Sequence, residues 1–288
     1  MINSLINNKY FVCGALLLAV AAPAPAPAQA QPLFDVPFVP TPHVVIDEML
    51  LLAKVTSRDF VMDLGSGDGR VLITAAKKFG ARGMGVDLDE DLVAQSLDAA
   101  AQAGVADRVR FLQQDLFKTD LSPATVITMY LLPGVMMRLR PKLLDLKPGT
   151  RLVSHDFRLE DWSPDAVTQI RKNTFLWIVP ARVAGKWQMN IALPGGAGTG
   201  TITLELRQKY QEIDGHAQFD GRHAQIWEPR LSGERLSFVI VDDRDRDAEA
   251  SLYFEGRVAG NVIEGSVRRG VGSVQTVQAW RALRVGAQ

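Results

Sequence analysis

The sequence is poor in cysteine and has no net charge, and each shortage excludes a class of function. Its single cysteine, Cys13, lies within the first 30 residues. The remaining chain therefore offers no thiol for a disulfide, a thiolate metal site or a cysteine nucleophile, and we expect no metal ion among its cofactors. The 32 basic residues balance the 32 acidic residues, so no general positive field attracts nucleic acid or an anionic membrane.

Long hydrophobic runs are also lacking. The apolar run at residues 10–20 is too short for an ordinary transmembrane span. It follows a polar start that contains Lys9, and it precedes an Ala/Pro stretch that ends in Ala28-Gln29-Ala30. This order predicts a secretory signal peptide over residues 1–30, cleaved before Gln31, and therefore export to the periplasm or the medium. The alternative is an uncleaved anchor that leaves the rest of the chain in the cytoplasm.

What the sequence does contain is typical of a soluble globular protein. Its 288 residues are 47% hydrophobic and 22% charged, which is enough for two domains with cores of their own. The patterns below place one domain at residues 31–184 and the other, rich in β-strands, at residues 185–288.

The most informative motif is V-M-D-L-G-S-G-D-G-R at residues 61–70. An apolar strand carries Asp63, and glycines follow at 65, 67 and 69. Such a turn favours glycine because its backbone takes unusual dihedral angles close to a ligand, facing the start of the next helix. Dinucleotide folds use the spacing G-x-G-x-x-G instead, and a pyrophosphate would be repelled by Asp63 and Asp68. A cofactor with a cationic amine and sulfonium suits these carboxylates, which favours S-adenosylmethionine over a nicotinamide cofactor.

Two more strand and helix units follow the glycine motif. A helix is predicted at residues 68–79, a strand at 83–86 that ends at Asp87, and a helix capped by Asp89. A strand at 108–112 then leads to Asp115. Consecutive units of this kind predict a parallel sheet. Asp87 can accept hydrogen bonds from the ribose hydroxyls, and Asp115 lies where a carboxylate can accept a hydrogen bond from the adenine amino group.

The next strands, at residues 125–129 and 151–154, end in Tyr130 and in His155-Asp156. Ligands of open α/β sheets sit at the carboxyl ends of the strands, so Tyr130 should border the transferred methyl group. His155 is the best candidate for a general base. Adjacent side chains of a strand point to opposite faces, so His155 and Asp156 should not share one substrate. The run N-P-P-Y is missing here, which disfavours nucleic-acid amines as acceptors.

The motif D-L-G-S-G-D-G, together with Asp87 and Asp115, resembles the class I S-adenosylmethionine-dependent methyltransferases. The runs T-M-Y-L-L-P at 128–133, L-K-P-G-T at 146–150 and S-H-D-F at 154–157 extend the likeness to small bacterial methyltransferases related to the lysine methyltransferases of mitochondrial membrane proteins. The resemblance spans about residues 37–183. It implies a Rossmann-like sheet, S-adenosylmethionine as cofactor, and a protein lysine or a small molecule as acceptor.

The resemblance also implies a set of site residues. Tyr130 and His155 are the catalytic candidates, and residues 40–43 would help to wall the pocket. The residues expected to bind the cofactor are Asp63, Gly65, Ser66, Gly67, Asp68, Gly69, Asp87, Leu88, Asp115, Leu116 and Tyr130.

From residue 173 onwards the pattern favours strands. A strand at 175–179 should complete the first sheet, after a helix starting at Ser163-Pro164. Short alternating strands follow near 185–187, 201–210, 223–227, 236–241, 251–258, 262–267 and 275–281, separated by turn signals such as 213–215, 232–233 and 259–261. This pattern predicts an antiparallel sandwich or small barrel. Because this domain shows no catalytic constellation, a noncatalytic exported binding protein built on a methyltransferase fold is the competing hypothesis.

Overall fold

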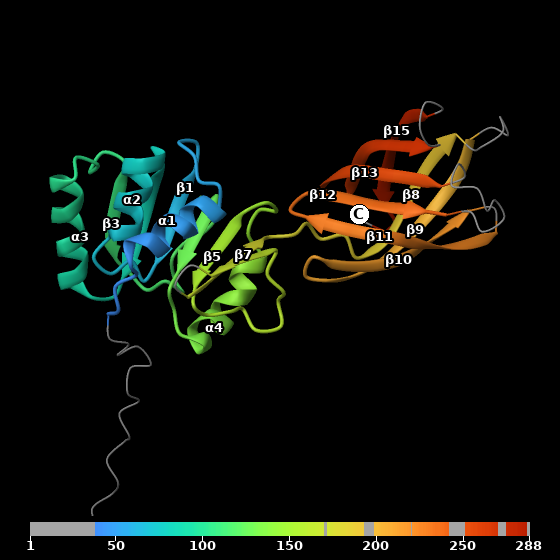
Figure 1. The fold of residues 1–288 in the computed structure, drawn as a ribbon. Helices are drawn as coiled ribbons and strands as arrows, with labels where there is room; N and C mark the ends of the chain where they lie inside the picture. The colour runs from blue at the N-terminus through green and yellow to red at the C-terminus, as the bar shows by residue number, and fades with distance from the viewer. Residues whose placement is uncertain are drawn as a thin grey trace, which may run out of the picture. The chain divides into compact units, whose positions relative to one another are not determined.

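The computed structural model describes residues 38–169, 172–192, 199–219, 221–241, 251–269 and 275–286. Its strands form two separate sheets, one of seven strands and one that closes into a barrel (Figure 1). The predicted signal peptide lies outside the described residues, as does the acidic run at 242–249, for which the sequence predicts a solvated loop.

The seven-stranded sheet has the order β3-β2-β1-β4-β5-β7-β6. Strands β1 to β5 are parallel, whereas β7 runs antiparallel to both β5 and β6. This confirms the predicted Rossmann-like sheet. Its strands are β1 (Phe60–Leu64), β2 (Arg82–Asp87), β3 (Val109–Gln113), β4 (Val126–Met129), β5 (Arg151–His155), β6 (Ala166–Gln169) and β7 (Asn173–Ile178).

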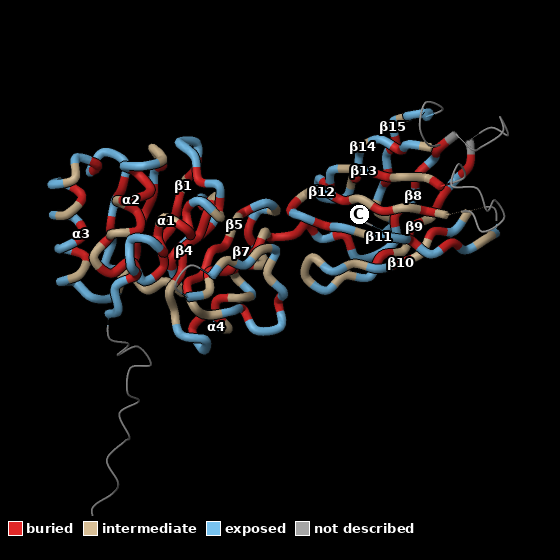
Figure 2. The backbone as a smooth tube through the Cα atoms, viewed as in Figure 1, coloured by how far each residue is buried: buried red, intermediate tan, exposed pale blue. Residues whose placement is uncertain are grey.

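Helices cover both faces of this sheet, which explains why its central strands are buried along their length (Figure 2). Helices α1 (His43–Leu52), α2 (Arg70–Phe79) and α3 (Glu90–Gln102) share one hydrophobic core with residues of one face. Helix α4 (Pro133–Leu144) packs on the other face, where Ser154 Oγ lies 3.6 Å from Met136 Sδ. Asp89 caps α3 as predicted, because its carboxylate accepts hydrogen bonds from the amides of Asp91 and Leu92.

The second sheet is a closed barrel of eight consecutive antiparallel strands, so the sandwich alternative is wrong. Its strands are β8 (Gly185–Ala192), β9 (Thr199–Lys209), β10 (Glu212–Phe219), β11 (Arg222–Ser232), β12 (Arg235–Ile240), β13 (Leu252–Ala259), β14 (Val262–Arg269) and β15 (Thr276–Arg284). Aromatic side chains pack together inside it. Phe238 stacks on Phe254 with ring centroids 4.7 Å apart, and Trp280 meets Phe254 edge-on at 5.3 Å.

Two local predictions are wrong. Ser163-Pro164 does not start a helix: these residues are irregular, and the chain continues from them into the edge strand β6. Residues 213–215 are no turn but part of β10, and the hairpin turns at Tyr210 and Gln211 instead. Gly215 marks a close approach of two strands, since a Cβ atom there would lie 2.1 Å from the carbonyl oxygen of Glu205.

Candidate active site

The glycine loop joins β1 to α2 and has the strained backbone that the sequence predicts. Gly65, Gly67 and Gly69 have φ angles of 76°, 51° and 78°, in the left-handed region that favours glycine. A Cβ atom at Gly69 would also lie only 2.7 Å from the ring of Phe111. The loop is fixed in place because the amide of Gly67 donates a hydrogen bond to Asp87 Oδ2 at 2.8 Å.

Asp63 is the buried carboxylate beside this loop, with 4% of its surface exposed. Thr128 Oγ1 donates a hydrogen bond to its Oδ1 at 2.7 Å. Burial, helped by the negative charges of Asp87 and Asp68, raises the pKa of Asp63 to about 7 despite the Thr128 hydrogen bond. A cation placed here would be stabilised by the carboxylate and would lower that pKa again.

Asp68 behaves differently, because Arg70 binds its carboxylate with two groups. Arg70 Nε lies 2.8 and 3.0 Å from the two carboxylate oxygens, and Nη2 lies 2.5 Å from Oδ2. Burial opposes the shift, but the hydrogen bonds and charge of Arg70 hold the pKa of Asp68 below its usual value. Arg70 Nη1 also donates to the carbonyl of Thr41 at 3.1 Å, which ties the segment before α1 to the glycine loop.

The remaining predicted cofactor residues lie at the carboxyl ends of β2 and β3. Asp87 accepts hydrogen bonds from backbone amides on each oxygen and keeps further lone pairs for a ligand. Asp115 Oδ1 accepts from the amide of Phe117 at 2.8 Å. Leu88 is 49% exposed and Leu116 is half-buried, so both can offer apolar surface to a flat ring.

These residues fit S-adenosylmethionine. The hydroxyl of Ser66 is buried in the glycine loop and has no hydrogen-bond partner within the described parts of the chain, so a ligand there would satisfy it. The start of α2 faces the loop, as in other nucleotide sites. Asp63 and Asp87 supply the carboxylates that a cationic, ribose-containing ligand requires.

An aromatic cluster lies at the carboxyl ends of β4 and β5. The rings of Tyr130 and His155 have centroids 4.3 Å apart, and Phe157 stacks on Tyr130 at 6.0 Å. His155 is 2% exposed. Burial and the charge of Lys172 lower the pKa of its imidazole, against the opposing effects of Asp156 and Glu48. The imidazole is therefore neutral at neutral pH and can accept a proton.

Asp156 directly follows His155 and binds Lys172. Its backbone has a positive φ of 68°, and its carboxylate accepts a hydrogen bond from Lys172 Nζ at 2.6 Å. Asp156 follows the last residue of β5, so strand alternation does not apply to it, and its charge raises the pKa of His155 against the effect of burial.

The sequence interpretation missed Glu48, which lies on α1 and is only 5% exposed. Neither of its carboxylate oxygens has a hydrogen-bond partner among the residues that the structure describes. The only sequence signal is a pair of acidic residues, Asp47 and Glu48, between the apolar positions 44–46 and 49–52 of the helix. Such a signal indicates burial only once the packing of the helix is known.

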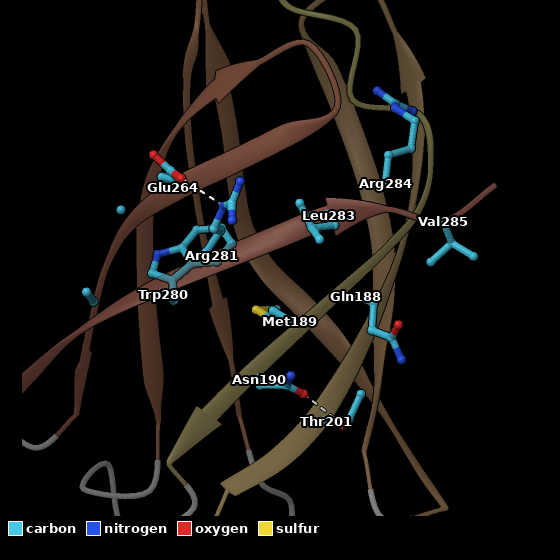
Figure 3. Close-up of a pocket in the computed structure, with 12 residues that line it drawn as sticks. Gln188, Met189, Asn190, Thr201, Glu264, Trp280, Arg281, Leu283, Arg284 and Val285 are labelled. Carbon is cyan, nitrogen blue, oxygen red and sulfur yellow. Dashed lines mark hydrogen bonds and ion pairs between the residues drawn. The ribbon is translucent and has the colours of Figure 1, made fainter. Parts of the chain in front are cut away.

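The barrel has a hollow of about 940 Å³ at the seam between β8 and β15 (Figure 3). Residues 282–284 of β15 pair with 187–189 of β8, and the two strands diverge beyond the pair of Ala282 and Met189. Polar groups that line the hollow bind one another. Arg281 Nε, for example, lies 2.9 Å from Glu264 Oε1. No group of three or more metal-ligating side chains occurs here or elsewhere in the described residues.

No helix among the described residues is both long enough and apolar enough to cross a membrane.

Comparisons with known proteins agree with this geometry. A profile of the ANTKMT methyltransferase domain matches residues 63–166. A protein-lysine N-methyltransferase of Saccharolobus islandicus is 42% identical over 153 residues, which cover 52% of this chain and 95% of that protein. The adenine nucleotide translocase lysine N-methyltransferase of Mus musculus is 36% identical over 46% of this chain, and the match spans 58% of the mouse protein.

A solved structure described as an RNA methyltransferase of Salinibacter ruber, in complex with S-adenosyl-L-homocysteine, is 50% identical. It covers 50% of this chain and 96% of its own, with a TM-score of 0.49. The Saccharolobus protein, matched along nearly its whole length, establishes the family. The chain belongs to the class I S-adenosylmethionine-dependent methyltransferases, and S-adenosylmethionine is its cofactor.

Proposed function

We propose that this methyltransferase acts on the side-chain amine of lysine in a protein. The observation that carries the proposal is the buried, neutral imidazole of His155, which lies against Tyr130 at the sheet edge that also carries the glycine loop. A lysine is protonated at neutral pH and must lose a proton before its nitrogen can attack. The names of the relatives from Saccharolobus islandicus and mouse support the same acceptor.

The residues of this chain divide the work between cofactor and acceptor. When bound, the cofactor supplies a methyl group on a positively charged sulfur. Asp63 and Asp87 hold the cofactor's charge and ribose, while Tyr130 and Phe157 wall the acceptor side. His155 takes a proton from the acceptor's ammonium group. The freed nitrogen lone pair is then available for the methyl group that the bound cofactor would supply.

The proposal is tested by methyl transfer to proteins of the cell envelope. Protein starting at Gln31 is incubated with envelope extract and methyl-labelled S-adenosylmethionine, and the labelled proteins are hydrolysed to amino acids. We expect label in methyl-lysine and at least a tenfold loss for Asp87→Ala, with Asp98→Ala, an exposed carboxylate on α3, as matched control. Label that appears in small molecules or RNA but never in protein lysine would overturn the proposed acceptor.

We also propose that the chain is exported, on the basis of its apolar run and Ala28-Gln29-Ala30 end. Protein recovered from the periplasm or medium should begin at Gln31 when its N-terminus is sequenced. Recovery of full-length chain in the membrane fraction, with the catalytic part protected from external protease, would favour the uncleaved anchor instead.

A further inference from the structure

Four side chains beside the aromatic cluster carry buried polar atoms that lack hydrogen-bond partners among the described residues. These are both carboxylate oxygens of Glu48, both ring nitrogens of His155, and the hydroxyls of Thr174 and Thr168. Each of these atoms is shielded from solvent. We call these four residues the polar row.

The polar row follows from the strand register. His155 on β5 lies directly opposite Thr174 on β7, and Thr174 lies opposite Thr168 on β6. Directly opposed residues on neighbouring strands point to the same face of a sheet. Helix α1 packs against these three strands, and the charge of its Glu48 acts on His155. The row therefore crosses three strands under one helix, and it begins beside Tyr130 at the methyl-transfer edge.

Burying polar groups in this way is costly. A buried carboxylate without a partner destabilises the folded state much more than an apolar side chain of similar size would. Glu48 also forms no ion pair with the residues that the structure describes, whereas Lys172, the cation that acts on His155, is held by Asp156 at 2.6 Å. The row thus holds a buried carboxyl group that no cation in the described part of the chain contacts.

We propose that the polar row is the binding site for the acceptor's primary alkylammonium group. Glu48 balances its positive charge, the hydroxyls of Thr174 and Thr168 accept hydrogen bonds from its N–H groups, and His155 accepts one proton. That transfer turns R–NH₃⁺ and neutral imidazole into R–NH₂ and imidazolium, so charge and protons balance. This inference rests on the proposed lysine acceptor, and it assigns Glu48, a residue outside the predicted site, to substrate binding.

The binding step is tested without turnover. The protein labelled with ¹⁵N-histidine and loaded with S-adenosylhomocysteine is titrated with n-butylammonium chloride, and the His155 signals are identified with His155→Gln. We expect saturable shifts of the His155 signals in the wild type and at least tenfold weaker binding in Glu48→Gln, which removes the charge but keeps the shape. Asp47→Asn, which changes a partly exposed neighbour on α1 that binds Lys78, should bind like the wild type.

The same variants separate a binding role from a structural one. S-adenosylhomocysteine affinity should be unchanged in Glu48→Gln, while kcat/KM for the lysine acceptor falls at least tenfold. The acidic limb of the pH profile should move to lower pH, because Glu48 raises the pKa of His155 against the effects of burial and Lys172. The other titratable groups that face His155 are Asp156, Lys172 and Tyr130, and they are identical in the wild type and in Glu48→Gln.

Two results would overturn the polar row as an ammonium site. One is a wild type whose His155 signals ignore n-butylammonium, which would indicate that buried water satisfies these atoms. The other is a folded Glu48→Gln variant with unchanged kcat/KM. Failure of the lysine proposal looks different, since n-butylammonium would still bind beside His155 while the label from envelope extract appeared in another acceptor.

Discussion

At the scale of single residues, the glycine loop sets two carboxylates five positions apart in opposite states. Asp68 is held ionised by Arg70, whereas burial raises the pKa of Asp63 to about 7. The difference in pKa follows first from the deeper burial of Asp63 and then from the partners, because Asp63 receives one neutral hydroxyl and Asp68 receives a guanidinium. Asp63 is therefore the group whose charge responds to a cationic ligand.

We predict that S-adenosylmethionine binding is linked to the ionisation of Asp63. The free protein holds a proton on Asp63 below about pH 7, and a bound cation lowers that pKa, so binding releases the proton. Affinity should therefore rise about tenfold between about pH 6 and about pH 8. Calorimetry in two buffers of different ionisation enthalpy measures both the affinity and the proton release.

Asp63→Asn is the matched control, since its amide oxygen can still accept the hydrogen bond from the Thr128 hydroxyl. It should bind more weakly at about pH 8 and lose the part of the pH dependence that Asp63 contributes. In the cofactor-free protein the pH dependence of folding stability has the opposite sign to that of cofactor affinity. Folded Asp63 keeps its proton to about pH 7 while the unfolded chain loses it near pH 4, so wild-type stability falls across that range and the variant avoids the loss. Equal pH dependence in both proteins would contradict the assignment.

At the scale of elements, the sequence predicts the parallel strands well because each is a short segment with two or more apolar residues between helices or turns. Strands β2 to β5 fall within two residues of their expected positions, β1 carries Asp63 as expected, and Asp89 caps α3. The mistakes are at β6 and β10. Pro164 suggested a helix start, and Gly215 suggested a turn, whereas it lies within β10 where two strands come close. The conformation at such residues depends on pairing with a neighbouring strand, which the local sequence does not show.

The sequence likewise predicts only part of the candidate site. Strand-end carboxylates and His155 could be named in advance because parallel strands gather their carboxyl ends at one edge. Glu48, Thr168 and Thr174 could not, because their meeting depends on the register of β5, β7 and β6 and on where α1 packs. The ion pair of Asp68 with Arg70 also depends on the loop's final shape.

At the scale of the whole molecule, the seven-stranded sheet and the barrel bury separate hydrophobic cores and share no strand. Ala181 and Val183 pack with the barrel's core, although they precede its first strand. Val179 is instead tied to the first sheet, since its amide donates to the carbonyl of Thr150 at 2.9 Å. The physical boundary between the two cores thus falls near residue 180, slightly before the boundary that the sequence predicts.

We predict that a chain of residues 31–180 binds S-adenosylhomocysteine with an affinity within about threefold of residues 31–288. Every predicted cofactor residue lies between Asp63 and Tyr130, and a threefold change corresponds to only about 0.7 kcal/mol. Calorimetry compares the two proteins, and circular dichroism confirms folding. A chain ending at 184 should be less soluble than one ending at 180, because it exposes Ala181 and Val183 without the barrel core that buries them. A folded 31–180 that no longer binds would mean that the barrel shapes the cofactor site directly.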